Sequence, residues 1–123
     1  MKTKKATPTA NIVRYLLLLL KLDEDGSGVR SVDLADRVGV KKPRVYQVIR
    51  TLSEKGLAEQ ERYARVYMTE SGRETAALYQ DCYNRMLPCI AKATGLREEI
   101  CRFAVYEILS RMDWDELHAY ALV

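Results

Sequence analysis

The first apolar segment of the chain covers every side of a helix. Its centre is the run from Tyr15 to Leu20, within a helix expected over Ala10–Leu22 that ends at the acid- and glycine-rich turn of residues 23–28. This run is far below the roughly 18–20 apolar residues that a bilayer requires. The pattern therefore predicts a helix buried on more than one side rather than a membrane span.

Two further helices are predicted from their end signals and an apolar stripe. Ser31 is expected to cap a short helix over 32–38, which Gly39 ends. The next helix is expected from about 42 to 55, because its apolar residues follow the i, i+3, i+4, i+7 pattern. These residues are Val45, Val48, Ile49 and Leu52. The short link between the two helices is typical of a helix-turn-helix.

A hairpin and a long helix are expected next. Two short strands are predicted at 57–62 and 65–69, joined at a tip of Tyr63-Ala64. Thr69 is expected to cap a helix over 70–93, in which Pro88 should cause a kink or a split.

Gly95 separates this long helix from two more, expected at 97–111 and 114–121. The order predicts a mostly α fold with a small β-hairpin. We expect a basic arm at 1–8, a winged helix-turn-helix DNA-binding domain at 9–70 and a helical region at 71–123.

Charge is distributed unevenly along the chain. The whole sequence has a net charge of +3, but residues 41–65 carry +4 and residues 66–123 carry −3. A basic block followed by an acidic one predicts one surface for a polyanion and another surface for something else.

The start of the helix at 42–55 has the chemistry of a DNA-reading helix. Lys41 occupies the cap position and Lys42 follows it, where the helix dipole is already positive. This arrangement weakens an isolated helix but suits a phosphate group. The residues expected to contact double-stranded DNA are Ser31, Lys41, Lys42, Pro43, Arg44, Tyr46, Gln47, Arg50, Arg62, Tyr63 and Arg65.

Three of these side chains suit particular contacts. Arg44 suits the O6 and N7 atoms of guanine, Gln47 suits the N6 and N7 atoms of adenine, and Tyr46 suits phosphate or sugar. On the hairpin, Arg62, Tyr63 and Arg65 interleave charge with a ring, as expected for a wing that lies along a minor groove or the DNA backbone.

Catalysis is not indicated. The sequence Gly26-Ser-Gly28 lacks the Lys-Thr of a phosphate loop, and one histidine, His118, makes neither a triad nor a metal motif. We therefore expect no enzyme. The basic start has no small-residue cleavage site after it, and we expect a cytoplasmic protein.

The three cysteines, Cys82, Cys89 and Cys101, have no short paired motif. We expect them to be small buried hydrophobic residues, with metal or redox sensing as the alternative.

Four stretches carry a resemblance to a known family. They are TANIVRYL from Thr9, VDLADRVGV from Val32, PRVYQVIRTLSEKGL from Pro43 and MTESGR from Met68. They resemble the diphtheria toxin repressor and manganese transport regulator family of iron-dependent repressors. The resemblance implies a homodimeric repressor on a palindromic operator, with the helices from about residue 70 onward as the dimerisation region.

This sequence departs from that family at the metal site. The family takes its ligands from the first helix, from a His and a carboxylate on the long helix, and from a Cys or Glu with a Glu-His pair on the next helix. The corresponding positions hold Arg14, Leu17, Tyr83, Leu87, Arg102, Tyr106, Leu109 and Ser110. These are poor ligands for a transition metal. We expect metal sensing to be lost and no cofactor to be needed, with Mn or Fe as the alternative.

Arg14 suggests a replacement for the metal's charge. Its guanidinium could tie the first helix to the later ones by bonding to Glu107, to Asp81 or to helix C-terminal carbonyls. The competing interpretation is a solvated arginine whose stem covers apolar surface. For the whole protein, the alternatives are a metal- or redox-responsive repressor with a non-standard site and a winged-helix module that binds other proteins.

Overall fold

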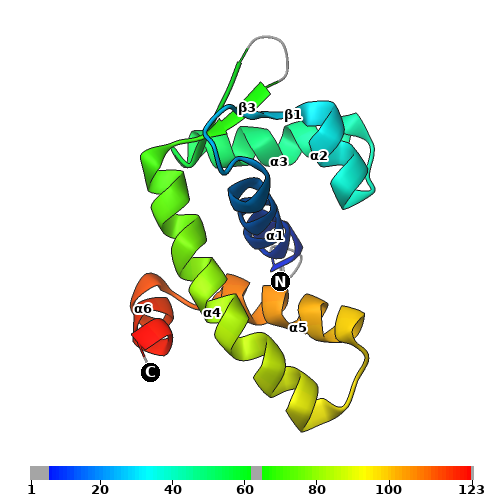
Figure 1. The fold of residues 1–123 in the computed structure, drawn as a ribbon, viewed down its shortest axis with the longest axis vertical. Coiled ribbons are helices and arrows are strands. Elements are labelled where there is room, and N and C mark those ends of the chain that lie inside the picture. The colour runs from blue at the N-terminus through cyan, green and yellow to red at the C-terminus, as the bar shows by residue number, and fades with distance from the viewer. Residues whose placement is uncertain (1–5, 62–64, 123) are drawn as a thin grey trace. The chain divides into compact units, whose positions relative to one another are not determined.

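The computed structural model describes residues 6–61 and 65–122 (Figure 1). The chain forms two compact units. The winged unit is Tyr15–Ala76, and the helical unit combines Met1–Arg14 with Ala77–Val123. Helices α1 (Ala6–Leu22) and α4 (Glu70–Thr94) therefore contribute residues to both units.

The winged unit contains a small sheet and a helix pair. After α1 come β1 (Val29–Arg30), α2 (Ser31–Val38), α3 (Lys42–Glu54), β2 (Ala58–Gln60) and β3 (Arg65–Met68). The strands form an antiparallel sheet in the order β1-β3-β2, with Val29 opposite Val66 and Ala58 opposite Met68. The mostly helical fold with a winged helix-turn-helix is thus confirmed.

Leucines and β-branched residues fill the core of the winged unit. The predicted stripe of α3 is buried along its whole length. The most deeply buried side chains of this unit are Tyr15, Leu16, Leu19, Leu34, Val45, Ile49, Leu52 and Val66. The leucine run of α1 therefore belongs to a hydrophobic core, as its short length indicated.

One strand of this unit was not predicted, and one predicted helix boundary is wrong. Strand β1 was not expected, because a two-residue strand shows no alternation and exists only through its pairing with β3. The N-cap of α2 is Arg30 rather than Ser31, and it makes no side-chain capping bond. Ser31 is the first helical residue instead.

The first helix begins earlier than expected. It starts at Ala6, so residues 6–8 of the expected basic arm are helical, while residues 1–5 lie outside the described residues. Pro8 does not prevent this start, because the amides of a helix's first turn have no helical partner in any case.

The helical unit adds α5 (Glu98–Arg111) and α6 (Trp114–Leu122) to its parts of α1 and α4. Pro88 does not split α4, which runs unbroken from Glu70 to Thr94. A proline removes a single N–H from the ladder, and the bonds on either side can keep the helix continuous. Cys82, Cys101, Val105, Leu109 and Leu117 are buried in this unit.

Helix α6 is fastened to α4 by two contacts. The thiol of Cys82 donates to the carbonyl of Leu117 over 3.3 Å, and the guanidinium of Arg85 lies 5.2 Å from the ring centroid of Tyr120. Both contacts belong to the helical unit.

Candidate nucleic-acid interface

The turn between α2 and α3 is set by the backbone of Gly39. This residue has a φ of 81°, in the left-handed region that glycine adopts without strain. The amides of Gly39 and Val40 both donate to the carbonyl of Ala35, at 2.8 and 3.2 Å. The chain therefore leaves α2 abruptly, and α3 begins at Lys42.

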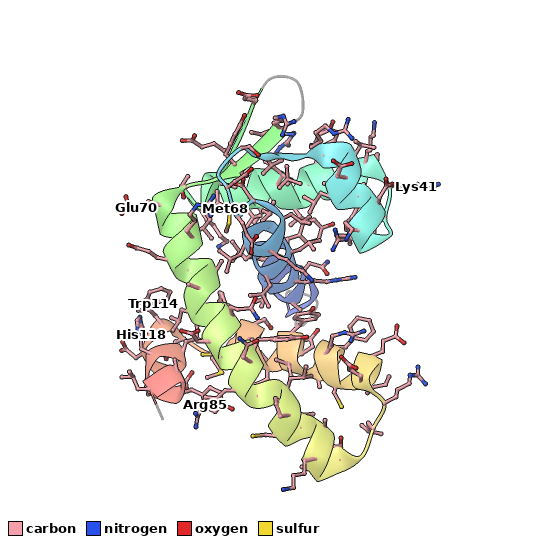
Figure 2. All side chains as sticks on the ribbon, in the orientation of Figure 1. Lys41, Met68, Glu70, Arg85, Trp114 and His118 are labelled. Carbon is pink, nitrogen blue, oxygen red and sulfur yellow. The ribbon has the colours of Figure 1, made fainter. Side chains whose placement is uncertain are left out.

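The face of α3 opposite its buried stripe is polar and exposed. Tyr46 keeps 41% of its surface accessible, although its ring is large and apolar. Figure 2 shows Lys41 directed outward from the turn before α3. The exposed residues at this end of the helix are Lys41, Lys42, Pro43, Arg44, Tyr46, Gln47 and Arg50. All seven were expected to contact DNA.

The N-terminus of α3 matches its predicted chemistry in part. Lys41 is the N-cap in extended conformation and makes no side-chain capping bond. Pro43 has no N–H, and the amide of Arg44 donates to the carbonyl of Lys41 over 3.1 Å. Among the described residues, the amides of Lys41 and Lys42 have no backbone acceptor, so both can bind a phosphate at this end of the helix.

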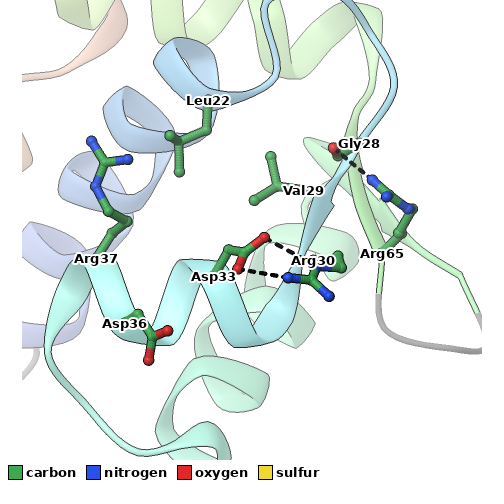
Figure 3. Close-up of a pocket in the computed structure, with 8 residues that line it drawn as sticks. All are labelled: Leu22, Gly28, Val29, Arg30, Asp33, Asp36, Arg37 and Arg65. Carbon is green, nitrogen blue, oxygen red and sulfur yellow. Dashed lines mark hydrogen bonds and ion pairs between the residues drawn. The ribbon is translucent and has the colours of Figure 1, made fainter.

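Arg65 has a structural role that sequence reasoning missed. Its guanidinium donates to the carbonyl of Gly28 over 3.0 Å (Figure 3) and to that of Ser27 over 3.3 Å. These bonds fasten the start of β3 to the turn before β1. The other two residues expected at the wing, Arg62 and Tyr63, lie outside the described residues.

Ser31 is buried in the winged unit rather than exposed on its surface. Its side chain is buried, and its hydroxyl accepts a hydrogen bond from the Gln60 amide over 3.4 Å. The Ser31 hydroxyl is therefore not exposed for contact with DNA in this structure.

Asp23 organises the winged unit, a role that no sequence pattern predicted. Its side chain is 1% exposed, and its carboxylate accepts bonds from the amide of Gly28 at 2.7 Å and that of Met68 at 3.5 Å. Arg73 approaches the same carboxylate at 3.2 Å and the carbonyl of Asp23 at 2.8 Å. One buried carboxylate thus joins the end of α1, the turn before β1, the end of β3 and the first turn of α4.

The first turn of α4 also packs tightly against the backbone of the winged unit. Thr69 donates its hydroxyl to the carbonyl of Gly56 over 2.7 Å and accepts from the amide of Gly72 over 2.9 Å, which confirms it as the cap of α4. A Cβ atom at Gly72 would collide with the carbonyl oxygen of Leu57. The contact requires glycine.

A cavity of about 390 Å³ lies beside α2 and β1 (Figure 3). It is lined by Leu22, Gly28, Val29, Arg30, Asp33, Asp36, Arg37 and Arg65. Arg30 and Asp33 form a two-point ion pair across its wall, with both N–O distances at 3.1 Å. Because acids and bases alternate around it, this cavity lacks the uniform positive charge of a phosphate site.

In the helical unit, several of the supposed former metal positions meet. Arg14 and Tyr106 line one small cavity together with Glu107, whereas Asp81 does not line it. The ring of Tyr106 stacks on Tyr83 with centroids 5.7 Å apart. Burial and the neighbouring Tyr106 raise the pKa of Tyr83 to about 12.

The other positions that the resemblance assigns to metal ligands are apolar or bonded locally. Leu17 and Leu109 are buried, Arg102 pairs with Glu98 at 2.9 Å, and Ser110 donates to the carbonyl of Glu107. Leu87 is half-buried on α4. The described residues contain no group of three or more His, Cys, Asp or Glu side chains that could hold a metal ion. Independence from a cofactor stays a prediction.

The cysteines divide into two kinds. Cys82 and Cys101 are buried as expected, and burial raises the pKa of the Cys82 thiol. Cys89 is exposed on α4, so the expectation of burial was wrong for this residue.

Comparison with known proteins agrees with this geometry. Residues 12–62 match the family model of the IclR helix-turn-helix domain. No curated protein sequence matches the chain. Among solved structures, IdeR from T. acidophilum is similar, with a TM-score of 0.62 at 18% identity over 88% of this chain and 51% of that one. The hypothetical protein SSo2273 from Sulfolobus solfataricus has a TM-score of 0.61 at 15% identity over 88% and 82%.

The fold and the matched segment define the class of the protein. It has a winged helix-turn-helix of the kind with which transcription regulators bind DNA. Kinship with the iron-dependent repressors is not confirmed by sequence, since the matching model is that of IclR and the likeness to IdeR concerns the fold. The chain spans about half the length of that IdeR chain. None of the described helices is long and apolar enough to cross a membrane.

Proposed function

We propose that this protein is a sequence-specific transcription regulator, most simply a repressor, that binds a palindromic operator as a homodimer. The observation that carries the proposal is the exposed N-terminal face of α3. It presents Lys41, Lys42, Arg44 and Gln47 on a helix whose opposite face is locked into the core. Lysines there bind phosphates and set the register, while arginine and glutamine read base edges.

The hydrogen bonds of Asp23 and Arg65 also support the proposal. They hold the turn before β1, the sheet and the first turn of α4 in one arrangement. A reading helix needs such a rigid support, because small displacements weaken two-point contacts to bases.

We also propose that DNA binding does not require a divalent metal. Arg14 replaces a ligand with a permanent positive charge, and Glu107 lines the same cavity. The guanidinium can act on Glu107 directly or through a bound molecule. Glu107 therefore suits the role of partner better than Asp81.

The test is selection of duplexes from a random pool, followed by titration of the selected duplex. We expect a palindrome whose half-sites lie about one helical turn apart, and a complex with two chains per duplex by analytical ultracentrifugation. Lys42→Gln should weaken binding to all duplexes alike and reduce the salt slope by about 1, whereas Lys21→Gln on α1 serves as the matched control. Failure to enrich any duplex would contradict the proposal.

A further inference from the structure

A small cavity in the helical unit has opposite charges on its wall. Its volume is about 170 Å³, and it is lined by Ala10, Asn11 and Arg14 of α1 and by Phe103, Tyr106 and Glu107 of α5. All six residues belong to the helical unit, so its geometry is independent of the winged unit. The volume is below the roughly 300–1,000 Å³ of pockets for drug-sized ligands, which restricts it to a small molecule.

The polar groups of this cavity suit a molecule with both charges. Arg14 supplies a guanidinium, which binds a carboxylate at two points. Glu107 supplies a carboxylate, which binds an ammonium group. The amide of Asn11 offers both a donor and an acceptor.

The remaining wall consists of Ala10 and two aromatic residues, Phe103 and Tyr106. Phe103 keeps 47% of its surface exposed, which is high for so apolar a side chain. The Tyr106 ring is held by its stacking on Tyr83, at an interplanar angle of 26°. An apolar group of a ligand would cover part of this surface and gain the corresponding hydrophobic free energy.

From these three features we infer that the cavity binds a free α-amino acid with a short apolar side chain. The carboxylate of the amino acid meets Arg14, its ammonium group meets Glu107, and its side chain lies against Phe103 and Tyr106.

Both charges of the ligand are needed for binding. Arg14 already has interactions within the unliganded chain, and Glu107 lies 3.7 Å from Arg111. A ligand therefore replaces the existing partners of these two side chains. A molecule with one charge makes only one of the two ionic contacts, which should cost roughly tenfold or more in affinity.

Binding would have a route to the winged unit through the chain itself. Helix α1 supplies Arg14 to the helical unit and continues from Tyr15 into the winged unit. If the proposed function holds, this shared helix is the element through which an amino acid held by α1 and α5 can change DNA affinity.

The experiment is calorimetric titration of the full chain with leucine and valine, in the absence of DNA. The matched analogues are 3-methylbutylamine, which lacks the carboxylate of leucine, and 4-methylpentanoate, which lacks its amino group. We expect at least one amino acid to bind, and both analogues to bind at least roughly tenfold more weakly.

Variants locate the site. Arg14→Gln and Glu107→Gln should each weaken binding roughly tenfold or more. The controls, Lys21→Gln on α1 and Glu99→Gln on α5, change exposed charges outside the cavity and should leave binding unchanged. Circular dichroism checks that each variant folds.

The inference is overturned if the wild-type chain binds neither amino acid, if an analogue binds as tightly as leucine, or if the cavity variants bind like their controls. Because this titration uses no DNA, a failure to bind duplexes would contradict the proposed function while leaving the ligand site standing.

Discussion

The two units of this protein are stabilised in different ways. In the winged unit, buried polar groups fix the backbone: Asp23 accepts two amides and a guanidinium, and Arg65 caps two carbonyls. In the helical unit, stacked tyrosines, a cation–π contact and a thiol hydrogen bond link the elements, and none of its described polar or charged side chains is as deeply buried as Asp23. Polar bonds are directional and apolar contacts are not, so the winged unit has the stricter geometry.

The two units also differ in the side chains that they expose. The winged unit exposes basic side chains around α3. The helical unit exposes large apolar side chains, those of Leu96, Phe103, Ile108 and Trp114. Figure 2 shows Trp114 and His118 on α6, and their rings meet edge to face at 4.8 Å. One unit therefore suits a polyanion, and the other has the composition of a surface that associates with protein or small ligands.

The largest expected effect comes from removing the polar centre of the winged unit. Asp23→Ala leaves two amides without their acceptor and removes the carboxylate partner of Arg73, which keeps only its bond to the main-chain carbonyl of residue 23. It should lower the free energy of unfolding by about 3 kcal/mol. Chemical denaturation measures this loss. Glu24→Ala, at the exposed neighbouring position, is the control and should have little effect. Equal losses in both variants would show that Asp23 is not the organising group.

Gly72→Ala should have the next largest effect. The added methyl group meets the carbonyl oxygen of Leu57, and moving apart the first turn of α4 and that backbone should cost about 2 kcal/mol. Thermal unfolding gives the measurement, with Ser71→Ala at the adjacent exposed position as the control. A variant as stable as wild type would mean that α4 can shift without cost.

Arg44→Ala should separate binding from folding. We expect a loss of about 1–3 kcal/mol of binding free energy on the selected operator, with relaxed preference at one base pair and unchanged unfolding. Arg102→Ala in the helical unit is the matched control, because Arg102 pairs with Glu98 and lies outside the winged unit. If both variants lose the same amount of binding free energy, the assignment of DNA binding to the winged unit is wrong.

The smallest effect concerns the stacked tyrosines of the helical unit. The pKa of Tyr83 is about 12 in the folded chain against 10.0 for an ordinary tyrosine. As the pH rises, the unfolded chain therefore loses the hydroxyl proton of Tyr83 before the folded chain does. The contribution of this group to the free energy of unfolding is complete below pH 10 and is lost as the pH rises towards 12. Tyr83→Phe should flatten this part of the stability profile. An unchanged profile would exclude Tyr83 as its source.

How far the sequence predicted these units depended on the range of the interactions. The stripe of α3, Gly39 and Lys41 are local signals, and the structure has all three where they were expected. Strand β1 was missed because it depends on a partner strand more than 30 residues away. Asp23 looked like an ordinary turn residue, since its partner Arg73 is 50 residues distant. The need for glycine at position 72 likewise comes from the backbone of Leu57.

The candidate ligand cavity could be predicted from the sequence only in part. Arg14 was conspicuous in the sequence as a cation beside five leucines, and Glu107 was one of two partners considered for it. The structure brings both residues to one cavity, but Phe103 and Asn11 gave no sequence signal. A helical register gives the face of each residue, whereas a cavity depends on how two helices pack.

The most direct test of the central claim is the affinity of the full chain for its selected duplex, measured by fluorescence anisotropy first in chelator and then with added manganese, iron or zinc. The exposed basic face of α3 predicts binding that weakens steeply with salt, with a log–log slope of about −0.9 per phosphate contact. The proposed metal independence predicts full affinity in chelator and no gain from metal. Binding that appears only when metal is added, or that does not depend on salt, would contradict the account.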